Sequence, residues 1–217
     1  MALAIFDLDN TLISGDSDYL WGKFLIKQGL VDAENFEQQN EQFYEDYKKG
    51  SLDIMAYQRF SLAPIANRPM EELDAWHRQF MEDFIQPIYL EKAQALVNSH
   101  RDKGDTLLVI TATNSFVTRP IAKLYGIENL LGTDPEVKDG VFTGEVDGIP
   151  TFQHGKVERL NMWLKETGEN LENSHFYSDS HNDIPLLEEV SFPIVVDADE
   201  QLLAHAQKKD WPIISLR

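Results

Sequence analysis

The sequence of 217 residues contains no cysteine. This absence excludes disulfide bonds, thiolate catalysis and zinc sites built from cysteine. No apolar run approaches the roughly 20 residues of a membrane span, and the apolar N-terminal stretch is interrupted by Asp7 and has no basic residues before it. Internal repeats, low-complexity tracts and linkers are also absent from the sequence. These absences favour a soluble, globular protein of the cytoplasm.

Basic residues are scarce compared with acidic ones. Lysine and arginine number 19 against 37 aspartates and glutamates, which gives a formal net charge of -18. A surface of this sign repels nucleic-acid phosphates and anionic lipid headgroups. We therefore expect neither a nucleic-acid nor a membrane partner. A hydrophobic content of 42% is nevertheless enough for a large core.

Short apolar runs recur along the chain and mostly follow stretches of helical character. They predict strands over residues 2–8, 106–111, 175–178, 192–197 and 211–216. Alternating strands and helices imply crossover connections and a parallel sheet. The expected fold class is therefore α/β, with a Rossmann-like parallel sheet as its core.

The alternation stops between the first two predicted strands. From Asp18 to about Ile85 the apolar residues have helical spacing, and no strand-like run occurs. We predict a helical cap domain over 16–87, inserted after the first strand, and a core domain formed by 1–15 and 88–217. A helix over 88–103, ended by Gly104, returns the chain to the core.

A second interruption of the helix and strand pattern lies in residues 136–152. Asp139-Gly140 and Asp147-Gly148 flank residues of alternating polarity, which is typical of a β-hairpin.

Two acids end the first predicted strand, in the segment "IFDLDNT". Ligands of open parallel sheets bind beyond the carboxyl ends of the strands, where Asp7 and Asp9 lie. Two close carboxylates suit a nucleophile that stays ionised and a partner that gives and takes a proton. Taken alone, the pair equally fits a polar turn after a strand.

Polar residues also follow the second predicted strand. In "ITATN", Thr111, Ala112 and Thr113 precede a predicted helix start at Asn114 and Ser115. Hydroxyls and free backbone N–H groups at such a position can hold a phosphate. A simple helix cap is the alternative interpretation.

A lysine and a second acid pair complete the candidate site. Lys156 lies at the start of an amphipathic helix, where its charge opposes the helix dipole, so it fits an anion partner as well as it fits a solvated surface residue. Asp179 and Asp183 follow the strand "HFYS". Acid clusters at strand ends supply oxygen ligands to Mg²⁺, although they also cap helices.

The ordered set "DLDNT", "TAT", Lys156 and "SDSHND" resembles the motifs of the haloacid dehalogenase superfamily. The helical insertion and the hairpin resemble those of its phosphoserine phosphatase-like subgroup. One departure is Ser178, where the family usually has glycine.

The resemblance implies a role for each motif residue. Asp7 is the expected nucleophile that forms an aspartyl phosphate, and Asp9 is the expected acid and base. Residues 111–113, with Thr111 foremost, are expected to bind the transferred phosphoryl group, and Lys156 to steady it. The resemblance implies Mg²⁺ as cofactor, and the ligands it implies are Asp7, the Asp9 backbone carbonyl and Asp179, with Asp183 in support.

The entry to the cap suggests the substrate. The resemblance implies that Asp16, with Asp18 nearby, holds a substrate ammonium and that Arg59 holds a carboxylate. The expected substrate is a small amine-bearing phosphate ester, with phosphoserine and histidinol phosphate as candidates. A phosphotransferase or phosphomutase and an inactive acidic binding protein are the alternatives. The cap aromatics are interpreted as packing core, and His154 and His181 as surface residues.

Overall fold

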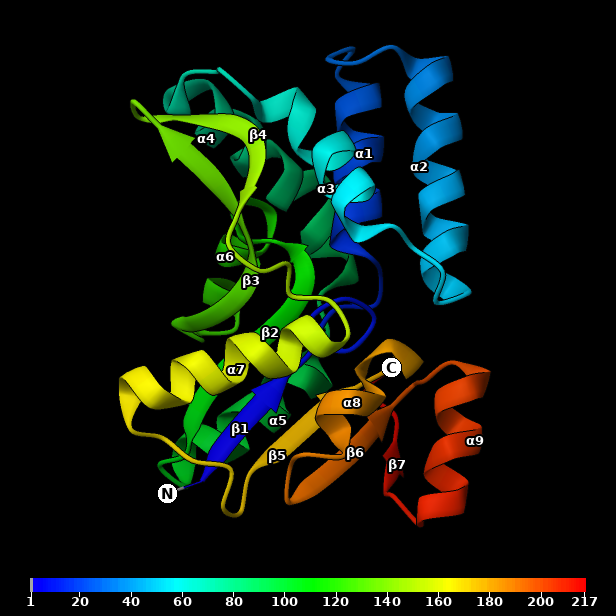
Figure 1. The fold of residues 1–217 in the computed structure, drawn as a ribbon, viewed down its shortest axis with the longest axis vertical. Coiled ribbons are helices and arrows are strands. Elements are labelled where there is room, and N and C mark those ends of the chain that lie inside the picture. The colour runs from blue at the N-terminus through cyan, green and yellow to red at the C-terminus, as the bar shows by residue number, and fades with distance from the viewer. Residues whose placement is uncertain (1) are drawn as a thin grey trace.

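The computed structural model describes residues 2–217, which form one sheet with helices on both faces (Figure 1). The strands are β1 Leu3–Phe6, β2 Thr106–Asn114, β3 Asn129–Lys138, β4 Val141–Asp147, β5 His175–Ser178, β6 Phe192–Val196 and β7 Ile213–Ile214. Their order across the sheet is β4-β3-β2-β1-β5-β6-β7. Neighbouring strands pair in parallel except β3 and β4. The predicted α/β fold is confirmed.

Of the predicted strands only 175–178 has the predicted bounds; β1 and β6 are shorter than predicted, and two others differ more. The strand predicted over 106–111 continues to Asn114. The run 211–216 contributes only two residues, Ile213 and Ile214, because it pairs with β6 alone at the edge of the sheet. The central position of β1, between β2 and β5, places its end in the middle of the sheet edge.

The sheet is covered on both faces, as its continuous apolar strands require. The core helices are α5 Glu91–Asp102, α6 Ser115–Leu124, α7 His154–Thr167, α8 Ile184–Leu187 and α9 Glu200–Lys209. Alternate residues of β1 point to opposite faces. Phe6 belongs to the same buried cluster as Val97 of α5, whereas Ile5 packs in the cluster that contains Leu160 of α7.

Four helices occupy the insertion after β1. They are α1 Ser17–Lys27, α2 Ala33–Lys48, α3 Ile54–Leu62 and α4 Met70–Phe80, followed by a π-helical turn, Met81–Ile85. Within the described residues 17–85 there is no strand, so the predicted helical insertion is confirmed. Short turns of 3₁₀ helix lie at Ala63–Ile65, Gln86–Ile88 and His181–Asp183. The exact boundaries 16 and 87 of the cap domain stay a prediction.

The helix that returns the chain to the core starts later than predicted. It begins at Glu91 because Tyr89 is extended and forms an isolated antiparallel bridge with Ile13. Gly104 ends this helix as expected: its φ is +77°, and its N–H donates to the Arg101 carbonyl at 2.9 Å. Glycine adopts this left-handed conformation without steric penalty.

The predicted hairpin is formed by β3 and β4. Asp139 and Gly140 both have positive φ, 51° and 80°, as a tight hairpin turn requires. The first half of β3 pairs in parallel with β2, which the sequence did not predict. The hairpin thus extends from the sheet to α3, where Glu145 pairs with Arg59.

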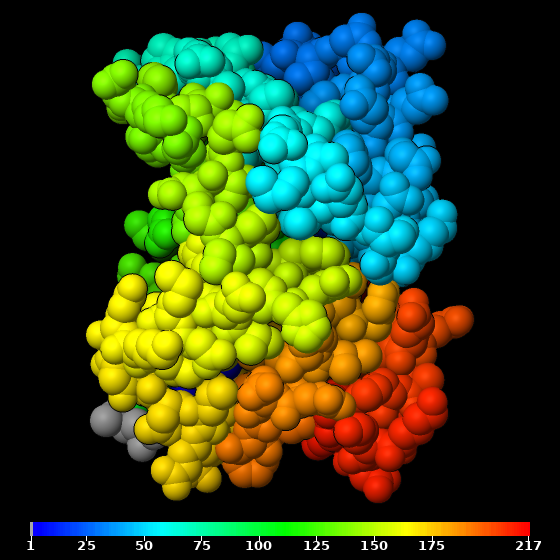
Figure 2. Space-filling view, viewed as in Figure 1, coloured from blue at the N-terminus to red at the C-terminus, as the bar shows by residue number. Residues whose placement is uncertain are grey.

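The insertion lies next to the part of the core that contains the last strands and helices. In Figure 2 the helices of the insertion, blue to cyan, form the upper part, and the last strands and helices, orange to red, form the lower part. The two parts touch where the end of α2 reaches the loop after β5, with Asn182 Nδ2 donating to the Tyr47 carbonyl at 3.2 Å. No helix within residues 2–217 has the length and apolarity needed to cross a membrane.

Candidate active site

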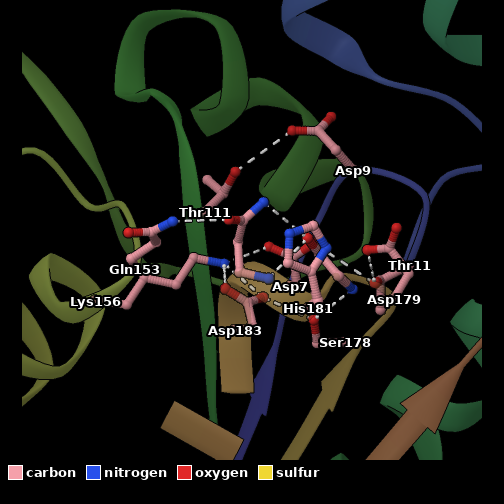
Figure 3. A network of polar contacts seen from close by, with 12 residues as sticks. Asp7, Asp9, Thr11, Thr111, Gln153, Lys156, Ser178, Asp179, His181 and Asp183 are labelled. Carbon is pink, nitrogen blue, oxygen red and sulfur yellow. Dashed lines mark hydrogen bonds and ion pairs between the residues drawn. The ribbon is translucent and has the colours of Figure 1, made fainter. Parts of the chain in front are cut away.

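Asp7 lies directly after β1 and forms the centre of a buried polar network (Figure 3). Its backbone N–H donates to the Tyr177 carbonyl of β5 at 2.9 Å, which fixes the strand end. Its side chain is only 7% exposed. Oδ1 accepts a hydrogen bond from Lys156 Nζ at 2.8 Å, whereas Oδ2 has a longer contact, 3.5 Å, with the Thr11 hydroxyl.

Lys156 is buried between two carboxylates. Its Nζ lies 2.8 Å from Asp7 Oδ1 and 2.7 Å from Asp183 Oδ1. Burial lowers the pKa of this lysine, but the charges of Asp183 and Asp7 outweigh it and raise the pKa above its usual range. Gly155 makes the approach of α7 possible, because a Cβ there would lie 2.1 Å from the Pro150 carbonyl oxygen.

Asp179 and Asp183 reach the same site from the end of β5. The Thr11 hydroxyl donates to Asp179 Oδ1 at 3.1 Å, so one hydroxyl lies between this carboxylate and Asp7. The Ser178 hydroxyl donates to Asp183 Oδ2 at 2.7 Å. Thr11 is a site residue that was not predicted from the sequence, although it ends the "DLDNT" motif. Ser178 replaces the usual glycine and supplies a partner to the second acid pair.

Asp9 turns away from Asp179 and toward β2 (Figure 3). Its Oδ2 accepts hydrogen bonds from the Thr113 hydroxyl at 2.8 Å and the Thr111 hydroxyl at 3.4 Å, and its Oδ1 accepts from the Ser17 N–H at 2.6 Å. Burial, followed by the charge of Asp16, raises the pKa of Asp9 to about 6. A carboxyl group with this pKa can change its protonation state near neutral pH.

The site holds more acid than the single lysine can neutralise. Burial raises the pKa of Asp7 to about 7, against the opposing effect of Lys156, and the charges of Asp183 and Asp9 raise it further. Burial and the charge of Asp7 also raise the pKa of Asp179 well above its usual range. Buried carboxylates that lie this close together repel one another, so a bound cation or a proton stabilises them.

The donor set fits Mg²⁺. Within residues 2–217 no three side chains of His, Cys, Asp or Glu converge as a ready-made ligand cluster. Mg²⁺ needs no such cluster, since it is usually bound by one or two carboxylates together with waters and substrate phosphate. Asp7 and Asp179, which share the Thr11 hydroxyl, supply hard oxygen ligands of this kind.

A cavity extends from Asp7 into the insertion, with an empty volume of about 600 Å³ including the space open to solvent. Its described lining residues include no lysine or arginine. They are Asp7, Asp9, Asn10, Asp16, Asp18, Tyr19, Asn40, Phe43, Tyr44, Tyr47, Leu52, Ile54, Tyr57, Thr111, Ala112 and Thr113. Five of the cap aromatics, which were interpreted as packing core, pack on other rings and also line this cavity.

The three predicted cap residues lie in different surroundings. Asp16 lines the cavity and caps α1, where its Oδ1 accepts from the Tyr19 N–H at 2.8 Å. Asp18 also lines the cavity, and its Oδ1 accepts from the Ser61 hydroxyl at 2.9 Å. Arg59 does not line it. Its side chain is 58% exposed and forms an ion pair with Glu145 on the outer surface, so its predicted role as a carboxylate clamp is wrong.

Contacts between the core and α2 close one end of this site. Asn182 Nδ2 donates to the Tyr47 carbonyl, and Asn182 Oδ1 accepts from Gln153 Nε2 at 2.9 Å. Gln153, just before α7, has a φ of +48°, which is uncommon for a residue other than glycine. His154 is exposed as expected. His181 is not a free surface residue, because its side chain is 14% exposed and pairs with Asp199 at 2.8 Å.

Comparison with known proteins agrees with this geometry. Residues 4–188 match the haloacid dehalogenase-like hydrolase family. The chain is 49% identical to a histidinol-phosphatase of Neisseria meningitidis serogroup C (strain 8013), over 99% of each chain. It is 32% identical to the phosphoserine phosphatase SerB1 of Mycobacterium tuberculosis, over 100% of this chain and 71% of that protein.

The fold is also that of a solved structure. A substrate-bound phosphoserine phosphatase complex superimposes with a TM-score of 0.71 at 20% identity, covering 98% of this chain and 92% of the other. At this identity the likeness concerns the fold alone. The family match, which spans most of the chain, and the close relative establish the assignment: the protein belongs to the haloacid dehalogenase-like hydrolase family.

Proposed function

We propose that this protein is a phosphatase that hydrolyses the phosphate ester of a small amine-bearing metabolite, with histidinol phosphate as the favoured substrate. The observation that carries the proposal is the buried arrangement around Asp7. Lys156 holds Asp7 on one side, Thr11 connects it to Asp179 on the other, and an acid-lined cavity begins at Asp7. Phosphoryl transfer needs positioning and charge neutralisation of this kind.

In the proposed reaction Asp7 attacks phosphorus. A bond forms between its carboxylate oxygen and phosphorus while the ester bond to the substrate oxygen breaks, and Asp9 gives its proton to that leaving oxygen. In the second step the oxygen of a water molecule bonds to phosphorus, its proton passes to Asp9, and the bond to Asp7 breaks to release inorganic phosphate. The pKa of Asp9, about 6, is suited to both proton transfers.

The remaining residues position the phosphoryl group. Lys156 is buried and positively charged beside Asp7, so it can pair with the phosphoryl oxygens as well as with the nucleophile. Thr111 and the backbone of 111–113 border the same cavity. Mg²⁺ held by Asp7, the Asp9 carbonyl and Asp179, with Asp183 in support, would supply further neutralisation of the nucleophile and the phosphate.

The cavity lining supports a cationic substrate without a carboxylate. Asp16 and Asp18 supply negative charge, and the described lining residues offer no lysine or arginine to a carboxylate. A substrate ammonium beside Asp16 gains a charge-assisted hydrogen bond in a site that excludes water. Phosphoserine has both an amine and a carboxylate, whereas histidinol phosphate has the amine but no carboxylate. The relative with 49% identity is a histidinol-phosphatase, which points the same way.

Phosphate release from three esters tests the proposal. With Mg²⁺ present, we expect the wild type to hydrolyse histidinol phosphate with a higher kcat/KM than phosphoserine, and either of them faster than an ester without an amine. Arg59→Ala serves as the control, because its side chain lies outside the cavity and its loss leaves all three values unchanged within about twofold. Equal use of the amine-free ester by the wild type would contradict the proposed substrate class.

A further inference from the structure

The far end of the cavity combines aromatic side chains with a buried acid. Tyr19, Phe43, Tyr44 and Tyr57, here called the aromatic wall, line it from α1, α2 and α3. The rings of Tyr19 and Tyr44 are 5.0 Å apart, and those of Phe43 and Tyr57 are 5.3 Å apart. The wall therefore brings aromatic rings from three helices to one cavity.

Asp18 is the acid at this end of the cavity. It is only 6% exposed, and the Tyr57 hydroxyl lies close to its carboxylate. One oxygen, Oδ1, accepts a hydrogen bond from the Ser61 hydroxyl, whereas Oδ2 is buried and has no hydrogen-bonding partner of good geometry among the described residues. Asp18 and Tyr57 thus form a polar pair within the lining of this end of the cavity.

The order of the acids along the cavity matches a particular kind of molecule. Asp7 lies at the phosphoryl end, and Asp16 follows, close enough for its charge to affect Asp9. Asp18 is beside Ser61 of α3, deeper in the insertion. A ligand that spans them has a phosphate, then an ammonium, then a flat group that carries an N–H donor.

We propose that Asp18 and the aromatic wall form a specificity pocket for the nitrogen-containing ring of the substrate, an inference that rests on the proposed function. Imidazole fits this description, since it has an N–H donor in both its neutral and protonated forms. Its ring packs against the aromatic wall while an N–H group donates to the Asp18 carboxylate. Ring faces attract a cationic ring in addition to the packing itself.

Three amino-alcohol phosphates separate these contributions. Histidinol phosphate has a ring with an N–H group, phenylalaninol phosphate has a ring without one, and alaninol phosphate has no ring, whereas all three keep the amine. We expect the kcat/KM of the wild type to fall in this order. The loss of a charge-assisted hydrogen bond predicts a decrease of about 10- to 100-fold between the first two esters, and the loss of ring packing a further decrease of about 3- to 10-fold.

Substitutions in the pocket test which residue is responsible for each of these decreases in kcat/KM. Asp18→Asn should lower the ratio of kcat/KM for histidinol phosphate to that for phenylalaninol phosphate, and Tyr57→Leu should lower the ratio of either ring ester to alaninol phosphate. Tyr57→Phe, which keeps the ring, should retain the second ratio. Glu41→Gln removes a charge from the exposed surface of α2 and serves as the control that changes neither ratio.

Calorimetric binding of histidinol and alaninol, the products without phosphate, tests the pocket without turnover. We expect tighter binding of histidinol by the wild type, and a smaller preference in Asp18→Asn, which keeps the aromatic wall. If no amine-bearing ester were hydrolysed, the proposed function would fail, but the binding preference would still support the pocket. Two results would overturn the proposed pocket and leave the proposed function standing. One is hydrolysis in which every variant keeps the wild-type ratios of kcat/KM between the three esters, and the other is equal binding of histidinol and alaninol by the wild type.

Discussion

At the scale of single residues, the site consists of acids in surroundings that oppose ionisation. Asp18 illustrates the consequence for stability, because burial raises its pKa from 3.8 to about 6. Between these two pH values the folded protein binds more protons at Asp18 than the unfolded chain does, so this residue makes the free energy of unfolding fall as the pH rises from about 4 to about 6.

Replacing Asp18 should remove this dependence. In urea unfolding with a chelator present, we expect the free energy of unfolding of Asp18→Asn to fall less than that of the wild type between pH 4 and 6.5. Glu41→Gln, an exposed charge change on α2, should parallel the wild type. If the curve of Asp18→Asn also ran parallel to the wild type, the buried acid would not be titrating in this range.

Asp9 provides the second residue-scale prediction. Its carboxyl group is held by Thr113, Thr111 and the Ser17 N–H at the mouth of the cavity. Asp9→Asn should lower kcat for an alkyl phosphate by about 100- to 10,000-fold, because the leaving alkoxide needs its proton. A nitrophenyl ester, whose leaving group is stable as an anion, should lose less in the same step. Equal losses in single-turnover cleavage of both esters would show that Asp9 is not the acid.

At the scale of elements, the end of α2 connects the insertion to the loops of the candidate site. The connection runs from Gln153 Nε2 through the Asn182 side chain to the Tyr47 carbonyl, each group hydrogen-bonded to the next. Asn182→Ala removes both hydrogen bonds, so we expect faster amide hydrogen exchange in residues 44–52. The strands β1 and β2 should keep their protection, because they are buried in the core. Unchanged exchange in 44–52 would mean that other contacts hold α2 in place.

Elements with a strong local signal were predicted correctly from the sequence. The Asp139-Gly140 turn and the Gly104 helix end follow from backbone conformations that few residues adopt. The parallel half of β3 was missed because its apolar residues are few and its pairing with β2 is non-local. The two-residue strand β7 was predicted too long because apolar character alone does not say which residues find a pairing partner.

The candidate site was predicted unevenly for similar reasons. The motifs of Asp7 and Asp179 were placed together correctly because parallel strands end at one edge, and Lys156 reaches them from the first turn of α7. Arg59 was misplaced because its position depends on how α3 packs, and the structure turns it toward Glu145 of β4. The aromatic wall was overlooked because helical spacing is the same for a side chain that packs in the core and one that borders a cavity.

At the scale of the whole molecule, acidic charge is concentrated at one place by the fold. The net charge of -18 is spread over the sequence, but the sheet edge gathers Asp7 and Asp183 beside Lys156, with Asp179 connected to Asp7 through Thr11. A cation that binds only the folded protein stabilises it. Millimolar Mg²⁺ should therefore raise the Tm of the wild type at pH 7.5, and Asp179→Ala should lose this increase. An equal increase in both proteins would place the cation elsewhere.

The central claim is that the phosphoryl group passes through Asp7. The most direct measurement is to quench the Mg²⁺-dependent reaction with acid, reduce the trapped acyl phosphate with borohydride, and locate the modified residue by mass spectrometry. The account predicts modification of Asp7 in the wild type and none in Asp7→Asn, which keeps the shape of the side chain but lacks the nucleophile. A phosphoenzyme carried by another residue, or full hydrolysis by Asp7→Asn, would contradict it.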